Sequence, residues 1–328
     1  MARGKKRGRL PVFLCIAAFW MIVGAVPVHG ETTRVDWMFA KDPSVSNREE
    51  ELPVDWQDTT DEGMLGKAVE LPILMYHNLT ESSAASSLSK DTMWVGQFRR
   101  HMELLQEHGY QTVSLEELIA FGENAAPLPE NPVMITFDDG YESVYTLAYP
   151  ILRELDMQAV VFPVGVSVGK DTYKETGIPI TPHFSWEQGA EMVASGVMSV
   201  QSHTYDMHQW RAFEIAGGME GLRPNALRRS GESLFSYANA LWDDLQRFRQ
   251  EAQGTGQAIV AVAYPGGSWD EVSERFLASY GIKCTFTIQK GKALIRPGSQ
   301  KDLFGLNRFY MTPWVTEEEL LEWVSENK

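Results

Sequence analysis

The chain has 328 residues, of which 44 are acidic and 29 are basic, and its formal net charge at pH 7 is −15. This acidic balance argues against nucleic acid as a partner, because binding to a phosphate backbone depends on clustered basic residues. Cys15 falls in an expected leader and leaves Cys284 alone, so we expect a core without an intrachain disulfide.

The first 30 residues have the pattern of a secretory leader. Five basic residues lie within positions 3–9, an apolar stretch runs from 10 to 26, and residues 28–30 suit signal peptidase cleavage. We expect cleavage after Gly30, or retention as an N-terminal anchor, because the apolar stretch approaches the shortest length that spans a bilayer. Cleavage would lower the net charge to about −20. The sequence therefore predicts an exported protein, either extracellular or associated with the cell surface.

Two regions follow the leader. Residues 31–66 are polar and rich in acids, which predicts an acidic linker or an arm that wraps around a folded domain. Residues 67–328 are long enough to bury a core as one domain. Strand-like runs alternate there with helix-like segments, and this alternation predicts an α/β domain with a parallel sheet or barrel.

The expected elements of this domain follow in chain order. Strand-like runs lie at 71–77, 133–140, 159–162, 197–202, 259–264, 284–288 and 306–310, and helix-like segments at 94–108, 186–195, 234–252 and 270–280. Ser114 and Glu117 form a capping box for a further helix. Residues 209–256 interrupt the alternation as an insertion, which either walls one side of a substrate cleft or only packs on the barrel as a peripheral hairpin.

Two adjacent acids end the most apolar of these strands. Asp138 and Asp139 follow a buried run and precede Gly140, so both carboxylates emerge where the strand gives way to a turn. The carboxyl ends of strands are where α/β folds place their chemistry. An Asp-Asp-Gly sequence alone, however, is usually only a turn at a strand end.

Two histidines follow a second apolar run. His203 and His208 come directly after residues 197–202. One carboxylate and two imidazoles can hold a divalent metal with a coordination position left open for water, and the other carboxylate is then free to accept a proton. Two histidines alone are equally compatible with hydrogen-bonded structural residues, but both motifs, each after a strand, favour a metal site.

The amino-acid sequences of these motifs resemble those of a known family. Residues 136–140 read Thr-Phe-Asp-Asp-Gly and residues 202–208 read Ser-His-Thr-Tyr-Asp-Met-His, and together they resemble the polysaccharide deacetylase family, also called the NodB homology domain or carbohydrate esterase family 4. The family's histidines are usually four residues apart; here they are five apart, a step of about 500° on an α-helix, so we expect an irregular loop or bulged turn. With Leu-Met-Tyr-His at 74–77, the resemblance is strongest to the poly-N-acetylglucosamine deacetylase branch. It covers roughly residues 68–328.

The resemblance implies a distorted (β/α) barrel and one divalent metal ion, with Zn²⁺ as the first candidate. Asp139, His203 and His208 would hold this ion, which would polarise an amide carbonyl and lower the pKa of a bound water towards about 7. Asp138, beside the ion but not a ligand, would take the proton from that water.

The chain departs from the family's pattern at two further motifs. The usual Arg-Pro-Pro-Tyr is replaced by Ala-Tyr-Pro-Gly at 263–266, which leaves the backbone N–H of Gly266 as an oxyanion donor. The usual Leu-x-His is replaced by Leu-Asn-Arg at 306–308, and no histidine follows His208.

These departures shift two roles to other residues. The resemblance to the branch with the five-residue spacing implies that His77, in the early Tyr-His, is the acid that protonates the leaving amine, and that Arg308 correspondingly orients Asp138. A lone histidine at a strand end is more often structural than catalytic, but the chain offers no other candidate acid of this kind.

The sequence thus predicts a hydrolase that removes N-acetyl groups from N-acetylglucosamine units of an extracellular or cell-wall polysaccharide. The N-terminus provides a means of membrane or cell-wall association. Two alternatives stay open: a catalytically weak carbohydrate-binding homologue, and a deacetylase that acts on peptidoglycan, chitin oligomers or O-acetylated xylan. Residues that grip distant sugar units lie on loops with no readable code, so the sequence alone does not choose among these substrates.

Overall fold

The computed structural model describes residues 66–214 and 221–325. The expected leader, residues 1–30, and all but the last residue of the expected linker, residues 31–66, lie outside the described residues. No helix within the described part of the chain is long and apolar enough to cross a bilayer.

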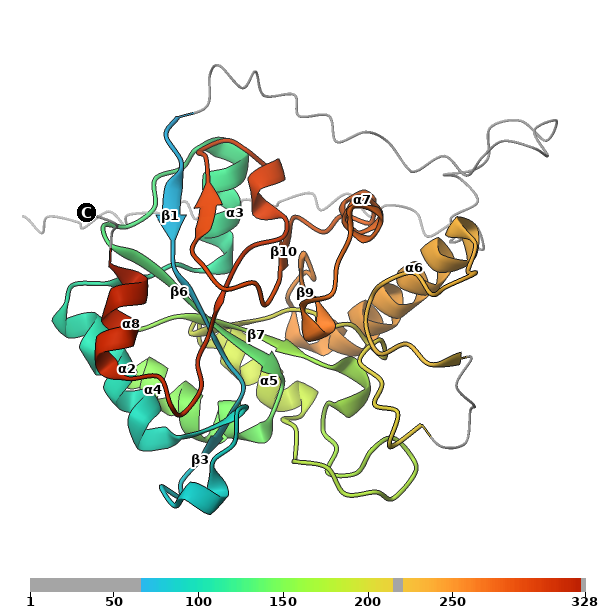
Figure 1. Cartoon of the computed structure of the whole chain (residues 1–328), viewed down its shortest axis with the longest axis horizontal. Helices are drawn as coiled ribbons and strands as arrows, with labels where there is room; N and C mark the ends of the chain where they lie inside the picture. Colours follow the sequence, from blue (N-terminus) through green and yellow to red (C-terminus); the bar gives the residue numbers. More distant parts are fainter. Residues whose placement is uncertain (1–65, 215–220, 326–328) are drawn as a thin grey trace, which may run out of the picture.

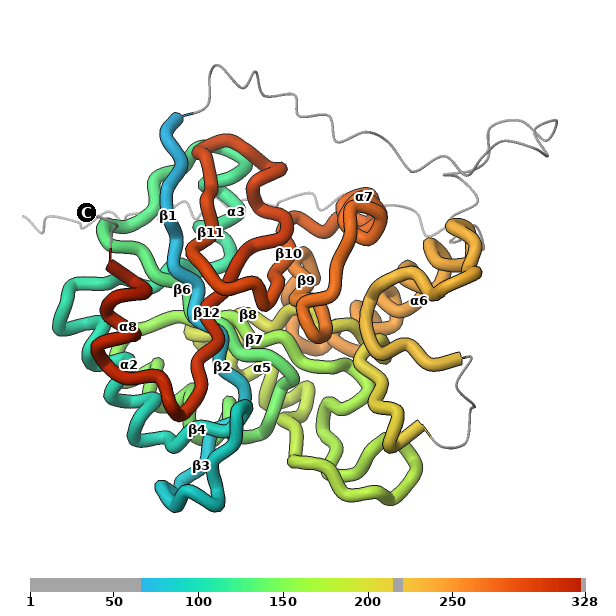
Figure 2. Tube along the Cα trace, viewed as in Figure 1, coloured from blue at the N-terminus to red at the C-terminus, as the bar shows by residue number. Residues whose placement is uncertain are grey.

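Parallel strands form a distorted barrel (Figures 1 and 2). The strands are β2 Ile73–Tyr76, β6 Pro132–Asp139, β7 Ala159–Pro163, β8 Met198–Val200, β9 Ala261–Ala263, β10 Cys284–Phe286 and β12 Phe309–Tyr310. The main sheet has the order β12-β2-β6-β7-β8, and β9 pairs with β10. The two gaps are closed by hydrogen bonds from Ala263 N to Ser202 O (3.0 Å) and from Leu306 N to Thr285 O (2.9 Å). This closed arrangement confirms the predicted α/β barrel.

Helices surround the barrel and smaller strands cover its ends. The α-helices are α2 Val95–Glu107, α3 Leu115–Asn124, α4 Tyr149–Glu154, α5 Trp186–Ala194, α6 Leu234–Glu251, α7 Glu271–Ser279 and α8 Glu317–Val324. A π-helical turn, η3 Val144–Ala148, leads into α4. The smaller strands are β1 Val69–Leu71, β3 Asn78–Thr80, β4 Thr92–Trp94, β5 Gln111–Thr112 and β11 Ala293–Ile295. Short 3-10 turns are η2 Ala85–Ser87, η4 Gly165–Ser167, η6 Ala252–Thr255, η7 Pro265–Gly267 and η8 Lys301–Leu303.

The alternating side chains of β6 separate two layers of the core. Ile135 and Phe137 pack outward against the helices, in the same cluster as Phe98 of α2. Met134 belongs to the cluster inside the barrel. Because successive strand residues face opposite sides, Asp138 shares the interior face with Met134. The strand thus delivers one of its terminal acids into the barrel.

The predicted elements are confirmed in order, but most predicted strands are too long. The run at 71–77 is divided at Pro72, which has no N–H to donate to a neighbouring strand. The runs at 259–264 and 284–288 contain only the short strands β9 and β10, and that at 306–310 only β12. The predicted capping box at Ser114 and Glu117 is present at the start of α3.

The insertion carries a helix with a core of its own. In α6, Tyr237 and Phe248 are buried, and they belong to one cluster with Phe276 of α7. Figure 1 shows α6 beside the barrel, on the flank away from α2 and α8. The insertion therefore packs on the barrel, and the loop that leads into it reaches the site described below.

Candidate active site

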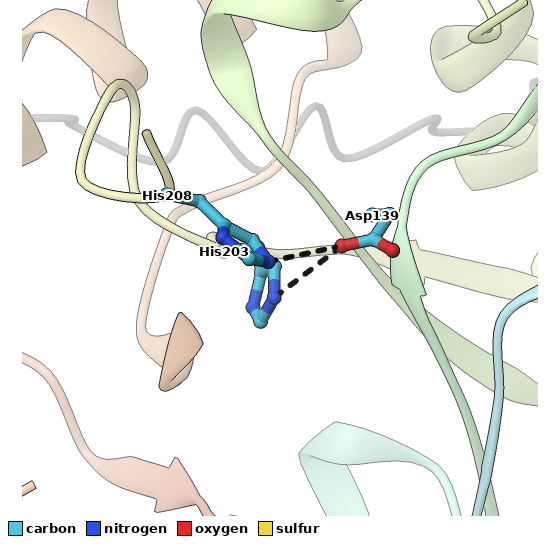
Figure 3. A group of neighbouring side chains, drawn as sticks. All are labelled: Asp139, His203 and His208. Carbon is cyan, nitrogen blue, oxygen red and sulfur yellow. Dashed lines mark ion pairs between the residues drawn. The ribbon is translucent and has the colours of Figure 1, made fainter. Parts of the chain in front are cut away.

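The three predicted metal ligands lie together after β6 and β8 (Figure 3). The Oδ1 atom of Asp139 is 3.6 Å from Nε2 of His203 and 3.6 Å from Nε2 of His208. One ligand atom from each side chain lies within 4.8 Å of the others. A carboxylate oxygen and two imidazole nitrogens that converge in this way form a donor set suited to Zn²⁺ or a similar divalent ion.

The environment of His203 prepares it to bind a metal. Its Nδ1 lies 2.8 Å from the carbonyl oxygen of Ala263, the last residue of β9. Burial lowers the pKa of His203 to about 4, so the ring is neutral, and Nδ1–H donates to that carbonyl. The lone pair is therefore on Nε2, the atom that faces Asp139, as is usual for a ligating histidine.

The two histidines lie on an irregular loop, as their five-residue spacing predicts. Thr204 has a left-handed φ of 67°, a conformation that is costly for a residue with a branched side chain. Its backbone N–H donates to Ser202 Oγ (3.0 Å), and its own Oγ1 accepts from Met207 N (3.2 Å). These local hydrogen bonds hold a tight turn that brings His208 back towards His203.

A residue of the insertion also holds this loop. Asp244 of α6 accepts hydrogen bonds from the backbone N–H groups of Tyr205 (2.7 Å) and Asp206 (2.8 Å). Arg247, one turn further along α6, lies over the ring of Tyr205 at 4.9 Å from its centroid. Burial raises the pKa of Asp244 to about 6 despite these two donors. One helix of the insertion thus fixes the segment between His203 and His208.

Sequence reasoning missed Asp244, although a signal was present. Within the predicted helix, Leu241, Leu245 and Phe248 form the buried stripe. Asp244 falls on that same stripe, three residues after the first and four before the last of them. An acid at such a position needs hydrogen-bond donors, and this requirement marks it as a candidate for a buried interaction.

The second acid, Asp138, is paired with Arg308 inside the barrel. The guanidinium NH1 and NH2 groups donate to Oδ1 and Oδ2 of Asp138, each at 2.7 Å. Arg308 Nε donates to the carbonyl of Thr287 (2.7 Å), and the guanidinium lies beside the packed rings of Phe162 and Phe286, 6.0 and 5.9 Å from their centroids. Arg308 is fully buried. The arginine that the sequence suggested as a partner of Asp138 is thus held by contacts on all sides.

This pairing sets the charge of Asp138. Burial alone would raise the pKa of its carboxyl group, but the Arg308 guanidinium and, to a smaller extent, His203 lower it to about 2. Asp138 is therefore ionised at every physiological pH. Its carboxylate is a fixed hydrogen-bond acceptor next to the metal ligands.

His77 directly follows β2, beside the end of β6. Its ring stacks on Tyr310 with 4.7 Å between the ring centroids and 24° between the planes. Its buried Nδ1 has no hydrogen-bond partner among the described residues. The hydroxyl of Tyr310 is hydrogen-bonded to Asp91, and Lys90 Nζ lies 4.4 Å from the centroid of the Tyr310 ring. The stacking fixes the plane of the His77 ring and leaves a polar atom available to a ligand.

Gly266 lies in the turn that follows β9, three residues after the carbonyl that holds His203. It has a left-handed φ of 60°, and the next residue, Gly267, has a φ of 64°. A Cβ at Gly267 would lie 2.4 Å from Cγ1 of Ile288, so this position also requires glycine for the close approach of two segments. The left-handed backbone conformation and the close packing at Ile288 thus account for the glycines of this turn. The role of Gly266 as an oxyanion donor stays a prediction.

An open cavity of about 340 Å³ adjoins the metal ligands. Asp139 and His208 line its inner end, while Tyr141, His183 and Trp210 are among its other lining residues. The Trp210 ring stacks on His208 with 6.1 Å between centroids and 28° between planes. Trp210 belongs to the insertion, so the first part of the insertion does wall a cleft. None of these three further lining residues carried a sequence motif.

A charged tether, formed by Lys174, Asp206 and Glu214, joins two segments that line this cavity. Lys174 Nζ donates to Oδ2 of Asp206 (2.8 Å) and to Glu214, which also accepts a hydrogen bond from Tyr173. The tether joins the segment after β7 to the loop of the two histidines. Both walls of the cavity are therefore held together by one lysine.

Comparison with known proteins agrees with this geometry. The family model described as polysaccharide deacetylase matches residues 125–285, a range that includes both acids, both histidines and the turn at Gly266. The chain belongs to the polysaccharide deacetylase family. It is accordingly a hydrolase of C–N bonds other than peptide bonds. His77 and Arg308 lie outside the matched range.

Two curated relatives show how far the similarity of this deacetylase extends. YxkH of Bacillus subtilis, assigned as a polysaccharide deacetylase, is 28% identical over 246 residues, which are 75% of this chain and 73% of that protein. The poly-β-1,6-N-acetyl-D-glucosamine N-deacetylase of Escherichia coli K12 is 30% identical over 186 residues. That match covers 55% of this chain but only 25% of the much longer relative.

Solved structures share the fold of this deacetylase. IcaB from Ammonifex degensii has a TM-score of 0.62 and 26% identity, with 79% of this chain and 97% of that chain covered. A de-N-acetylase from Aggregatibacter actinomycetemcomitans has a TM-score of 0.65 at 24% identity, covering 78% of this chain and all of that chain. The distorted barrel is thus the fold of known deacetylases.

Proposed function

We propose that this deacetylase is exported and uses a divalent metal to remove N-acetyl groups from N-acetylglucosamine units of an extracellular or cell-wall polysaccharide. The observation that carries the proposal is the convergence of Asp139, His203 and His208, with the ionised Asp138 beside them and an open cavity in front. Relatives named as poly-N-acetylglucosamine deacetylases support the substrate class.

The ligand atoms fit a divalent cation. The neutral ring of His203, oriented through Nδ1 by Ala263, presents its Nε2 lone pair, and Asp139 supplies negative charge. When bound, Zn²⁺ or a similar ion polarises the acetamide carbonyl and makes water more acidic. This chain's own residues must then position the water, the carbonyl and the leaving amine.

Asp138 is placed to orient and deprotonate the attacking water. The pKa of its carboxyl group, about 2, makes it a weak base on its own, so it depends on a water that is already acidified. Arg308 holds both carboxylate oxygens and so fixes their direction. The same pair ensures that Asp138 is never protonated before the reaction begins.

The two remaining roles fall to His77 and Gly266. His77 has a ring fixed on Tyr310 and an unpaired Nδ1, so it is placed to donate a proton to the departing sugar amine. The N–H of Gly266 is the candidate donor to the oxygen that gains negative charge. Asp138 and His77 then act as base and acid on opposite ends of the same bond.

Export rests on the leader pattern of residues 1–30, which also offers attachment to the membrane or the cell wall. A polymer outside the cell requires an enzyme outside the cell. Mass spectrometry of the secreted protein would test the expected cleavage after Gly30, whereas recovery of the intact N-terminus in the membrane fraction would show a retained anchor.

Acetate release from a panel of polymers tests the substrate. We expect the Zn²⁺-loaded protein to release more acetate from poly-β-1,6-N-acetylglucosamine than from peptidoglycan, chitin oligomers or O-acetylated xylan. A chelator should abolish the release and added metal should restore it. Full metal occupancy with no acetate from any polymer would instead identify a carbohydrate-binding homologue without activity.

A further inference from the structure

A second groove, separate from the cavity at the metal ligands, lies between α2 and α8. Its volume is about 440 Å³, within the range of roughly 300–1,000 Å³ typical of ligand sites. Trp94 and Trp314 stand on its two sides, and Gln97, Arg100 and Glu317 supply polar groups. We call this site the tryptophan groove.

Both tryptophans are unusually accessible. Trp94 is 40% exposed and Trp314 is 66% exposed. Among the described residues the only other exposed tryptophan is Trp210, at 58%, and it lines the cavity beside His208. Exposed indole rings are rare on surfaces that contact only water, and a flat apolar ring with a polar edge suits the C–H face of a pyranose.

Within the described structure, a buried polar atom without a partner belongs to a residue that lines the groove. His101 is 1% exposed and lines the groove, and its Nε2 has no partner among the described residues. Its Nδ1 lies 3.2 Å from the hydroxyl of Tyr76. Burial raises the pKa of Tyr76 and lowers that of His101 to about 4, so both side chains are neutral, and this hydrogen bond leaves Nε2 as the ring nitrogen without a partner in the described part of the chain. A buried polar atom without a hydrogen-bond partner costs free energy unless a ligand supplies that partner.

The position of the Trp94 ring depends on a glycine that leaves room for it. It ends β4 and precedes α2, and its ring lies across Gly96 in the first turn of that helix. A Cβ at Gly96 would lie 2.4 Å from the indole ring. On the other side, Gln97 Nε2 donates to the carbonyl of Val315 (3.1 Å), which ties α2 to the segment that carries Trp314.

The groove is connected to the active site through the chain on both sides. Trp314 comes four residues after Tyr310, whose ring stacks on His77. Trp94 ends β4, which pairs with β3, the strand that directly follows His77. In Figure 1, α2 and α8 lie side by side at the left of the barrel, and the segment at 164–183 that lines the other cavity lies at the lower right. The groove and the cavity are thus lined by segments that lie on different flanks of the barrel in this view.

We infer that the tryptophan groove binds N-acetylglucosamine units of the substrate polymer at a distance from the unit being deacetylated. Trp94 and Trp314 would stack on pyranose faces, and a hydroxyl group of the sugar would form a hydrogen bond with His101 Nε2. This inference rests on the proposed function, because it assumes the polymer substrate that is proposed there. It adds a second contact that only a chain of several units can reach.

Trp94→Ala, Trp314→Ala and the double variant test the inference. On polymeric poly-N-acetylglucosamine the double variant should raise KM about tenfold with kcat nearly unchanged, as expected when binding that is equal in ground and transition state is lost. On a small aryl acetate ester its kinetics should match the wild type, because that substrate does not extend to the groove. Trp314→Tyr should retain most of the polymer affinity, since it retains an aromatic face.

Leu294→Ala is the matched control, because Leu294 is a large apolar side chain with 62% exposure on β11, away from the groove. It should leave polymer binding unchanged. Equal weakening by Leu294→Ala and Trp314→Ala would show unspecific adsorption and overturn the inference. A loss of turnover on the small ester in the tryptophan variants would also overturn it, since the groove would then act only by supporting the active-site fold.

A binding measurement separates the two proposals. Asp138→Asn protein, which should deacetylate the polymer far more slowly than the wild type, should sediment with insoluble poly-N-acetylglucosamine, and adding both tryptophan substitutions should release it. If the wild type deacetylates the polymer but the tryptophan variants bind and act as it does, only the groove inference fails. If the wild type neither binds nor deacetylates any polymer of the panel, the proposed function fails and the inference fails with it.

Discussion

Asp139 and the two histidines meet at one point, but the chain holds the carboxylate side and the histidine side of that point by different means. The acids end β6, a long central strand, and Asp138 is fixed by a buried arginine inside the barrel. The histidines lie on a loop that Asp244, from the insertion, holds through two backbone N–H groups. The carboxylate side therefore depends on a charge pair in the core, and the histidine side on hydrogen bonds to a peripheral helix.

The difference separates what each side is expected to control. A buried charge pair is costly to break, so changes at Asp138 or Arg308 should affect both chemistry and the stability of the barrel. A loop held by a neighbouring helix can shift without unfolding the core, so changes on the histidine side should affect mainly metal affinity. The following substitutions test this division, from the largest expected effect to the smallest.

The two adjacent acids should separate chemistry from metal binding. Asp138→Asn should lower kcat by about 10²–10⁴-fold, the usual effect of removing a general base, while about one equivalent of metal remains bound. Asp139→Asn, like His203→Ala and His208→Ala, should lose metal because it removes a ligand. Metal analysis of purified protein with acetate-release kinetics measures both properties. The same behaviour of the two Asp variants in both assays would contradict the division of roles.

Arg308→Met should destabilise the metal-free protein by about 3–5 kcal/mol near neutral pH, because it leaves Asp138 buried without its partner. In the wild type the pKa of Asp138, about 2, lies below its unfolded value, so its contribution to stability is present above about pH 4 and is lost as the pH falls towards 2. The difference between wild type and variant should therefore be largest near neutral pH and shrink in acid.

Urea unfolding in the presence of a chelator, repeated from pH 7 to pH 3, measures this difference. Arg296→Met provides a control, because Arg296 also pairs with an acid, Asp302, but at a partly exposed position. Arg296→Met should lower the free energy of unfolding by less than Arg308→Met does. A difference between wild type and Arg308→Met that does not change with pH would show that the loss comes from packing and not from the charge of Asp138.

His77→Ala should lower turnover of an N-acetylglucosamine oligomer by about 10²-fold with metal occupancy unchanged, which is the usual contribution of a general acid. The loss should be smaller on an activated aryl acetate ester, because its leaving group departs without a proton. Parallel kinetics on the two substrates make the comparison. Equal losses would point to a structural role for the ring that stacks on Tyr310, and normal amide turnover would remove His77 from the mechanism.

Asp244→Asn should weaken metal affinity by about 10–100-fold, the range found when a group that orients metal ligands is replaced. Near-normal kcat should return at saturating metal, because Asp138 and His77 are untouched. Asp243→Asn is the matched control, since it makes the same charge change on the neighbouring, exposed residue of α6. Competition with a chromophoric chelator measures the affinities. An affinity that is unchanged, or that falls equally in both variants, would show that α6 does not set the loop.

The sequence by itself determined the acids, the histidines and the order of strands and helices. Asp138, Asp139, His203 and His208 each follow an apolar run, and parallel strands bring their carboxyl ends to one edge, so local pattern was enough to predict that they meet. Comparison with the family's usual motifs, and not the strand pattern, proposed Arg308 as a partner of Asp138, and the structure places its guanidinium 2.7 Å from that carboxylate.

Only the tertiary structure decided what surrounds them. The contact between Asp244 and the histidine loop, the stacking of Tyr310 on His77 and the tryptophan groove each join segments from different parts of the chain. Most of the predicted strands were also longer than the observed ones, because an apolar residue can pack beside a sheet without forming hydrogen bonds within it. Such contacts depend on how the helices pack around the barrel, and this packing has no local period that a sequence displays.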